Sequence, residues 1–131
     1  MGIFKSIFGS DSDNGNDDTK QLKWKPLTSV DQLSLITEAS KTRPQAIFKH
    51  STRCGVSRMV LKTFEVDFNL EPNTYDFYLI DLLNYREVSS AISETFDVHH
   101  QSPQLLIIKN GDVVIHDSHG AINNMDLQQY A

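Results

Sequence analysis

The sequence predicts an α/β domain in which helices cover both faces of a four-stranded mixed central sheet. Two observations support this fold class. Helix-type and strand-type patterns of apolar residues alternate from residue 22 onward, in the order α, β, α, β, α, β, β, α. A strand–helix–strand unit forces its two strands to be parallel with a right-handed crossover, whereas a hairpin makes the last two strands antiparallel.

A first helix is predicted between Ser29 and Pro44. Ser29 and Gln32 have the spacing of a capping box, in which a hydroxyl residue is followed three residues later by Gln. Arg43-Pro44 ends the helix, because the residue before a proline disfavours the helical conformation. The apolar face of this helix comprises Leu33, Ile36 and Ala39.

The middle of the chain predicts two strands separated by a helix. Residues 46–50 form a short strand, residues 51–54 turn the chain, and a helix follows that ends before Glu71-Pro72-Asn73. Its apolar residues recur at spacings of three and four: Val56, Met59, Val60, Phe64 and Phe68. Residues 75–83 are a nearly continuous apolar run, as expected for a strand covered on both faces.

The last third predicts a helix, a hairpin and a final helix. Asn84 and Glu87 form another cap-plus-Glu pattern at a helix start. Residues 105–109 and 113–116 are strands joined by Asn110-Gly111, a strong hairpin signal. A last helix is predicted from Asn123, with Ile122 and Leu127 placed as a hydrophobic staple across its start.

Length and composition exclude several classes of protein. The 131 residues suffice for one domain. The net charge of -5 argues against a nucleic-acid binder, because phosphate binding needs clustered Lys and Arg. The single cysteine excludes an internal disulfide and a four-thiolate metal site within one chain. No apolar run is long enough for a transmembrane segment.

The domain is predicted to occupy residues 22–131. Residues 1–21 are predicted to be a flexible N-terminal stub and acidic linker, because residues 10–18 contain four Asp and no apolar side chain. Such a segment buries too little apolar surface to offset the entropy lost on ordering.

Cys54 is the candidate reactive group because it follows a buried strand and opens a helix. The free N–H groups and partial positive charge of a helix start stabilise an anion, so a thiol there ionises more readily and becomes nucleophilic. Lys49, His50, Arg53 and Arg58 surround it in the sequence and would further favour the thiolate. A lone cysteine is otherwise commonly a small buried hydrophobe; the polar turn favours the reactive interpretation.

Ser57 lies where a dithiol oxidoreductase would carry its second cysteine, one helical turn after Cys54. Its hydroxyl can donate a hydrogen bond to the thiolate but cannot form a disulfide, so an outside thiol must resolve any mixed disulfide on Cys54. The alternative, an ordinary serine in the first turn of a helix, is equally consistent with the sequence.

Ser102-Pro103 precedes the strand that begins at Leu105. The default for an X-Pro bond in a folded protein is trans. A cis bond would turn the backbone of Ser102 outward, where an extended substrate could add a strand beside Cys54.

We expect no metal site. His99 and His100 are adjacent, so in a strand they would point to opposite faces, and His116 and His119 do not have a recognised ligand spacing. Asp81, at the end of its strand, is either a buried group that handles protons for the thiol or an ordinary strand-end aspartate.

Three segments resemble the monothiol bacilliredoxins, the YtxJ/BrxC-type proteins of the bacillithiol system. Residues 48–57, Phe-Lys-His-Ser-Thr-Arg-Cys-Gly-Val-Ser, resemble their active-site segment; residues 99–104 resemble the segment before their cis-proline; and residues 110–120 resemble their closing hairpin. The resemblance covers residues 22–131 and implies a thioredoxin-like fold, which also fits the element order.

Gly55 departs from the family pattern, because members often carry Pro after the cysteine. Cys54-Gly55-Val56-Ser57 is therefore also similar to the Cys-Gly-Phe-Ser site of monothiol glutaredoxins, which bind a shared iron–sulfur cluster. The paired glycines and acidic residue with which glutaredoxins hold glutathione are not found near the C-terminus. An iron–sulfur carrier is thus the second hypothesis, and a non-catalytic thioredoxin-like adaptor that binds a partner beside Pro103 is the third.

The resemblance to bacilliredoxins implies a cytoplasmic monothiol thiol–disulfide oxidoreductase that removes bacillithiol from protein mixed disulfides. Bacillithiol would be its co-substrate, bacillithiolated client proteins its partners, and we expect a monomer. Cys54 and Ser57 would be catalytic, with Cys54 attacking the bacillithiol sulfur. The residues expected to bind substrate or cofactor are Lys49, Arg53, Gly55, Arg58, Ser102 and Pro103, the three cations through the carboxylates of the cofactor.

Overall fold

The computed structural model describes residues 22–131, so the predicted stub and linker, residues 1–21, lie outside the described residues. Along the chain the elements are β1 (Trp24–Pro26), α1 (Asp31–Ala39), β2 (Gln45–His50), α2 (Gly55–Asp67), β3 (Asp76–Asp81), α3 (Arg86–Phe96), β4 (Gln104–Lys109), β5 (Asp112–Ser118) and two 3-10 helices, η3 (His119–Asn124) and η4 (Leu127–Tyr130).

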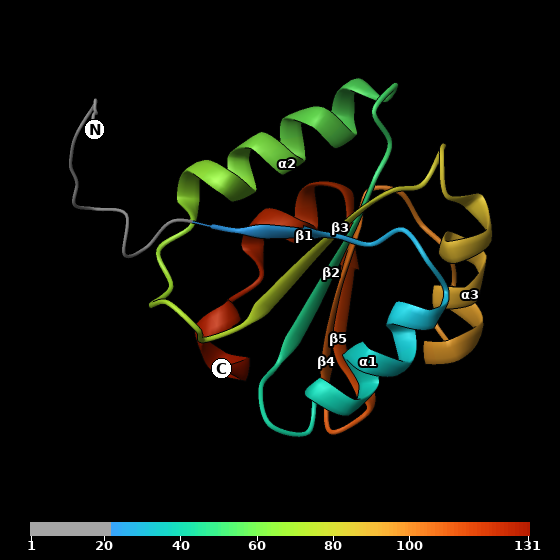
Figure 1. The fold of residues 1–131 in the computed structure, drawn as a ribbon. Helices are drawn as coiled ribbons and strands as arrows, with labels where there is room; N and C mark the ends of the chain where they lie inside the picture. Colours follow the sequence, from blue (N-terminus) through green and yellow to red (C-terminus); the bar gives the residue numbers. More distant parts are fainter. Residues whose placement is uncertain (1–21) are drawn as a thin grey trace, which may run out of the picture.

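The elements form one mixed sheet with the strand order β1-β3-β2-β4-β5 (Figure 1). β1, β3 and β2 run parallel, and β4 and β5 are antiparallel to their neighbours. The α/β prediction is confirmed, with five strands in place of four. The additional strand, β1, has three residues and pairs Trp24 with Phe77 at the sheet edge. It is too short to show a period of two in the sequence.

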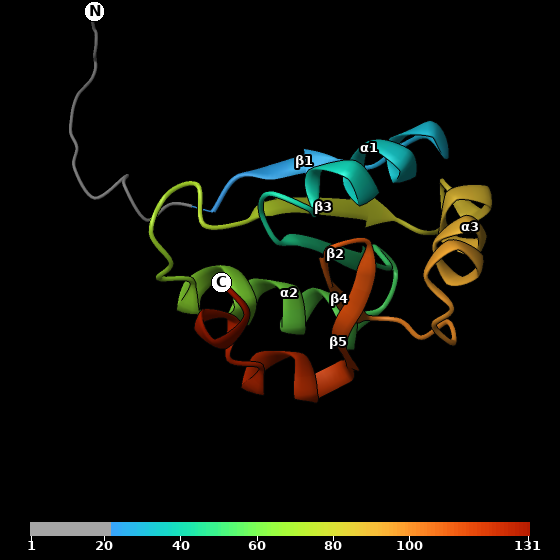
Figure 2. The ribbon, with the colours of Figure 1, turned by 90° about the horizontal axis from the view of Figure 1, so that it is seen from below.

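Helices cover both faces of the sheet (Figure 2). α1 and α3 lie on one face, and α2 with the two 3-10 helices lies on the other. All six residues of β2 are buried, because its side chains alternate between two cores. Ile47 packs in the core under α1 and α3, whereas Ala46 and Phe48 pack in the core under α2.

The two predicted helix caps differ from the observed ones. α1 begins at Asp31 after Val30, and the Ser29 hydroxyl does not cap it; the Gln32 half of the box forms, with Oε1 accepting from the backbone N–H of Ser29 at 3.0 Å. The predicted cap at Asn84 is wrong. Its amide donates to the Asp81 carboxylate at 2.7 Å, a charge-assisted bond that competes with capping.

The hairpin prediction is confirmed and the last predicted helix is wrong. Asn110 and Gly111 have φ values of 53° and 85°, as a type I′ turn requires at its two central residues. In place of a helix from Asn123, the C-terminus forms η3 and η4. Ile122 is 1% exposed and packs in the core under α2, so it is not available as a staple for a following helix. Tertiary packing outweighs the weak propensity of so short a segment.

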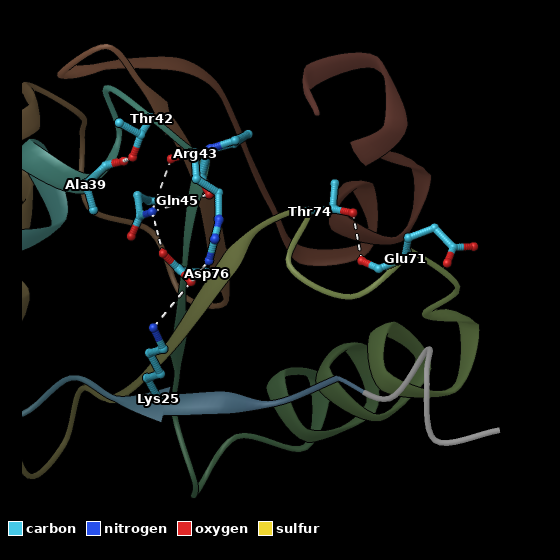
Figure 3. A network of polar contacts seen from close by, with 9 residues as sticks. Lys25, Ala39, Thr42, Arg43, Gln45, Glu71, Thr74 and Asp76 are labelled. Carbon is cyan, nitrogen blue, oxygen red and sulfur yellow. Dashed lines mark hydrogen bonds and ion pairs between the residues drawn. The ribbon is translucent and has the colours of Figure 1, made fainter. Parts of the chain in front are cut away.

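A polar network ties together the strand ends farthest from the Cys54 loop (Figure 3). Asp76 accepts hydrogen bonds from Gln45 at 2.8 Å, Arg43 at 3.0 Å and Lys25 at 3.3 Å. Burial by itself raises the pKa of Asp76, but the hydrogen bonds from Gln45, Lys25 and Arg43 and the charge of Lys25 outweigh it and lower the pKa. The carboxylate therefore stabilises the pairing of β2 with β3 where Gln45 and Asp76 are in register.

We predict that Asp76→Asn lowers the free energy of unfolding by about 1–2 kcal/mol at neutral pH, because charge-assisted hydrogen bonds are lost while two of the donors are partly exposed. The folded-state pKa lies below the unfolded value, so this stabilisation is present above about pH 4 and declines as the pH falls through the folded-state pKa. Urea unfolding at neutral and acidic pH measures both effects. The exposed Asp112→Asn is the control; a deficit in Asp76→Asn that does not shrink in acid would contradict the assignment.

Candidate active site

Cys54 occupies the N-cap position of α2, as the sequence predicts. β2 ends at His50, and a turn is closed by a hydrogen bond from the Cys54 N–H to the Ser51 carbonyl at 3.2 Å. The Cys54 carbonyl accepts the first helical bond, from the Arg58 N–H at 3.0 Å. No side chain caps the helix start, and Cys54 is partly exposed. The thiol thus lies at a helix N-terminus whose first N–H groups have no intrahelical partner.

Contacts within the turn fix the loop that carries Cys54. The Arg58 guanidinium reaches back one turn of the helix and donates to the Thr52 carbonyl at 3.0 Å. Gly55 is the first helical residue, a position where proline is favoured in helices generally. A Cβ at Gly55 would meet only the Arg58 guanidinium, at 3.9 Å, so the local space does not demand glycine.

Ser57 is fully buried and its hydroxyl serves the turn in front of the helix. Its Oγ lies 2.8 Å from Nδ1 of His50 and accepts the backbone N–H of Ser51 at 3.1 Å. Both bonds lead toward the end of β2 rather than toward the Cys54 sulfur. Ser57 therefore joins the first turn of α2 to the strand from which the Cys54 loop departs.

His50 is the site residue that sequence reasoning left out of the binding and catalytic set. It is 7% exposed and packs edge-on to Phe48. Burial lowers the pKa of His50; Arg58 lowers it further, while Asp81 and Glu65 act in the opposite direction. The lowered pKa favours the neutral imidazole, whose Nδ1 is hydrogen-bonded to the Ser57 hydroxyl. The spacing of these two residues is not a recognised motif, so only the fold reveals their contact.

The side chain of Lys49 does not lie with the other cations near Cys54. It is fully buried, and its Nζ lies 3.5 Å from the Ser93 hydroxyl of α3. Desolvation by burial lowers its pKa to about 8. Because successive strand residues face opposite sides, Lys49 lies on the α1/α3 side while Phe48 packs under α2. The expected contact of Lys49 with cofactor carboxylates does not fit this position, and strand alternation was the signal that could have shown it. Arg53 and Arg58 remain exposed.

Pro103 lies at the same end of the sheet as the Cys54 loop. β4 pairs with β2 so that Gln104 is opposite Lys49, which places Pro103 beside the end of β2. The Ser102–Pro103 peptide bond is cis, in contrast to the default expected from the sequence. The Pro103 carbonyl accepts from the His119 N–H at 3.0 Å, and the Ser102 hydroxyl is buried without a hydrogen-bond partner.

Asp81 has a structural role in the loop after β3. Its Oδ1 accepts from the Leu83 N–H at 3.2 Å and its Oδ2 accepts from the Asn84 amide. Within residues 22–131, no three His, Cys, Asp or Glu side chains gather in a way that could hold a metal ion. In the same part of the chain, no helix is both long and apolar enough to cross a membrane.

Solved structures similar to this chain have the thioredoxin fold. A solved structure described as a putative oxidoreductase with a thioredoxin fold is 30% identical, with a TM-score of 0.67 over 79% of this chain and 89% of that one. Thioredoxins of Malassezia sympodialis and Trypanosoma brucei brucei share the fold. The first is 19% identical, with a TM-score of 0.63 over 82% of this chain and 87% of that one. The second is 21% identical, with a TM-score of 0.62 over 82% and 86%.

The match to a protein family narrows the assignment further than the shared fold does. Residues 25–127 match the family described as monothiol bacilliredoxin BrxC. The family and the thioredoxin-like fold together indicate a thiol redox role, which is consistent with one cysteine at a helix start. The chain belongs to the monothiol bacilliredoxin family.

Proposed function

We propose that this protein removes bacillithiol from protein mixed disulfides and that Cys54 is its nucleophile. The observation that carries the proposal is the position of the only cysteine of the chain, partly exposed at the uncapped start of α2. The first N–H groups of a helix have no intrahelical partner and can hydrogen-bond to an anion, and the thiolate is the attacking species in disulfide exchange.

The proposed reaction has two exchange steps. In the first, the Cys54 thiolate attacks the bacillithiol sulfur of the client mixed disulfide; a Cys54–bacillithiol disulfide forms, the client–bacillithiol bond breaks, and the client leaves as a thiolate that takes a proton from solvent. In the second, a thiolate from bacillithiol or a dithiol partner attacks the bacillithiol sulfur and releases Cys54. No net oxidation occurs in either step.

The Ser57 network supports resolution by an outside thiol. A serine hydroxyl cannot close a disulfide, and here it is buried and bonded to His50 and to the Ser51 backbone. Ser57 is therefore proposed as a positioning residue that holds the turn in front of Cys54. Arg53 and Arg58, both exposed beside Cys54 in the sequence, are proposed to attract the anionic co-substrate.

The proposed backbone site for the client lies at Ser102 and Pro103. The register of β4 with β2 supports this placement, because it puts the start of β4 at the end of the sheet where the Cys54 loop begins. An extended segment of the client protein would pair there with the main chain while its disulfide faces Cys54.

We predict that the reduced protein, mixed with a bacillithiolated substrate protein, gains the mass of one bacillithiol on Cys54, while the substrate loses the same mass. Cys54→Ala removes the only thiol and should show neither change. Intact-mass spectrometry of both chains measures the transfer. Wild-type protein alkylated at Cys54 before mixing is the control that keeps the native sequence. An unchanged mass of both reduced wild-type protein and substrate would overturn the proposal.

We predict that Ser57→Ala still forms the adduct, but more slowly, and lowers the free energy of unfolding by about 1–3 kcal/mol, because a buried N–H and a buried imidazole lose their partner. The exposed Ser34→Ala on α1 is the matched control and should behave as wild type. Intact-mass spectra of samples quenched at successive times give the rate of adduct formation, and urea unfolding gives the free energy of unfolding. Ser57→Cys restores the dithiol spacing and should form an internal disulfide with Cys54. Wild-type rate and stability in Ser57→Ala would contradict the positioning role.

A further inference from the structure

A polar pocket lies beside the Cys54 loop, and of its lining only Arg53 enters the reaction as described so far. It has a volume of about 400 Å³ and is lined by Thr52, Arg53, Leu83, Asn84 and Arg86. The first two residues belong to the turn that leads into α2, and the other three to the loop and first residue of α3. We call it the Arg53–Arg86 pocket.

The parallel pairing of β2 with β3 brings these two loops together. His50 and Asp81 are in register at the ends of the two strands, and the Leu82 N–H donates to the His50 carbonyl at 3.0 Å. Both strands therefore deliver their following loops to one edge of the sheet, where the starts of α2 and α3 lie (Figure 1). In open α/β sheets this edge, outside the carboxyl ends of the strands, is where ligands bind.

The pocket is electropositive. It contains two guanidinium groups, and none of its lining residues is acidic. Neither Arg53 nor Arg86 forms an ion pair with another residue of 22–131. The nearby Asp81 is already occupied, because its two oxygens accept from the Leu83 N–H and the Asn84 amide. Glu87, in the first turn of α3, is exposed and outside the lining.

A helix start adds to this charge. α3 begins at Arg86 and has no side-chain cap at Tyr85, so its first N–H groups and the positive end of its dipole are available to an anion. Two guanidinium groups beside an uncapped helix start suit a carboxylate, which arginine binds in a bidentate manner. Arg53 lines the pocket and directly precedes Cys54, so the pocket adjoins the loop that carries the thiol.

We propose that the Arg53–Arg86 pocket binds a carboxylate of the small thiol that exchanges with Cys54, and so selects anionic small thiols over neutral ones. The inference rests on the proposed function and adds a subsite to it. The pocket positions the small thiol, not the client protein, so that its sulfur is the one attacked by Cys54.

Two symmetric small disulfides separate this subsite from the reactivity of Cys54 itself. Dithiodipropionic acid carries carboxylates, whereas hydroxyethyl disulfide is neutral. Cys54 attacks either one, forming a mixed disulfide and releasing one small thiolate, so intact-mass spectrometry of the full chain follows both reactions. Rates measured in parallel with a free neutral cysteine derivative correct for the intrinsic reactivity of each disulfide.

We predict that wild-type protein prefers the diacid and that Arg86→Gln lowers the ratio of the diacid rate to the neutral rate about tenfold, equivalent to about 1.4 kcal/mol. Arg86→Lys, which keeps the charge but not the bidentate geometry, should lower it less. Lys62→Gln removes an exposed charge on α2 outside the pocket and should leave both rates unchanged. Circular dichroism confirms that each variant is folded.

The outcomes separate the two proposals. If both disulfides react with wild-type Cys54 but the rate ratio is the same in wild type and Arg86→Gln, the subsite is overturned and the proposed function stands. Equal losses in Arg86→Gln and Lys62→Gln would indicate general electrostatic attraction and would also overturn the subsite. If neither disulfide reacts with Cys54 of the wild-type protein, the proposed function itself fails.

Discussion

The pairing of β2 with its two neighbours is the constraint on which the rest of the structure depends. β2 is buried along its whole length, parallel to β3 and antiparallel to β4. Its carboxyl end therefore meets the carboxyl end of β3 and the beginning of β4 at one edge of the sheet. The Cys54 loop and the loop into α3 begin at this edge, and the segment at Pro103 enters β4 there. No other element needs to bring them together, because hydrogen-bond register alone fixes their proximity.

A strand covered on both faces cannot leave polar side chains unpartnered without a cost in stability. β2 carries a buried polar side chain at each end, and each has a hydrogen-bond partner. Gln45 bonds to the Asp76 carboxylate at the amino end, and His50 bonds to Ser57 at the carboxyl end. The first contact joins two strands; the second joins the strand to α2, the helix that carries Cys54. The His50–Ser57 contact thus anchors the loop that carries Cys54 to the buried strand β2. Lys49, next to His50 in the strand but on the opposite face, is buried with its Nζ 3.5 Å from the Ser93 hydroxyl, and this burial lowers its pKa to about 8.

The monothiol character of the chain follows from the same local architecture. Where a dithiol protein of this fold needs a second sulfur, this chain has a serine whose hydroxyl is committed to the strand end. Cys54 remains partly exposed at an uncapped helix start. A chain with one cysteine cannot form a disulfide within itself, so any disulfide on Cys54 joins it to another molecule.

Local patterns in the sequence determined much of this molecule. The helix from residue 55, the Asn110-Gly111 turn and the placement of Cys54 at a helix start follow from periodicity and turn chemistry within a few residues. Only the tertiary structure decided the edge strand at Trp24, the burial of Lys49 away from the thiol, the His50–Ser57 contact, the meeting of Arg53 with Arg86, and the 3-10 turns around Ile122. Each of these depends on groups that are distant in the chain or on packing stronger than local propensity, and the physical reason is the same: a short segment does not specify which neighbour will cover it.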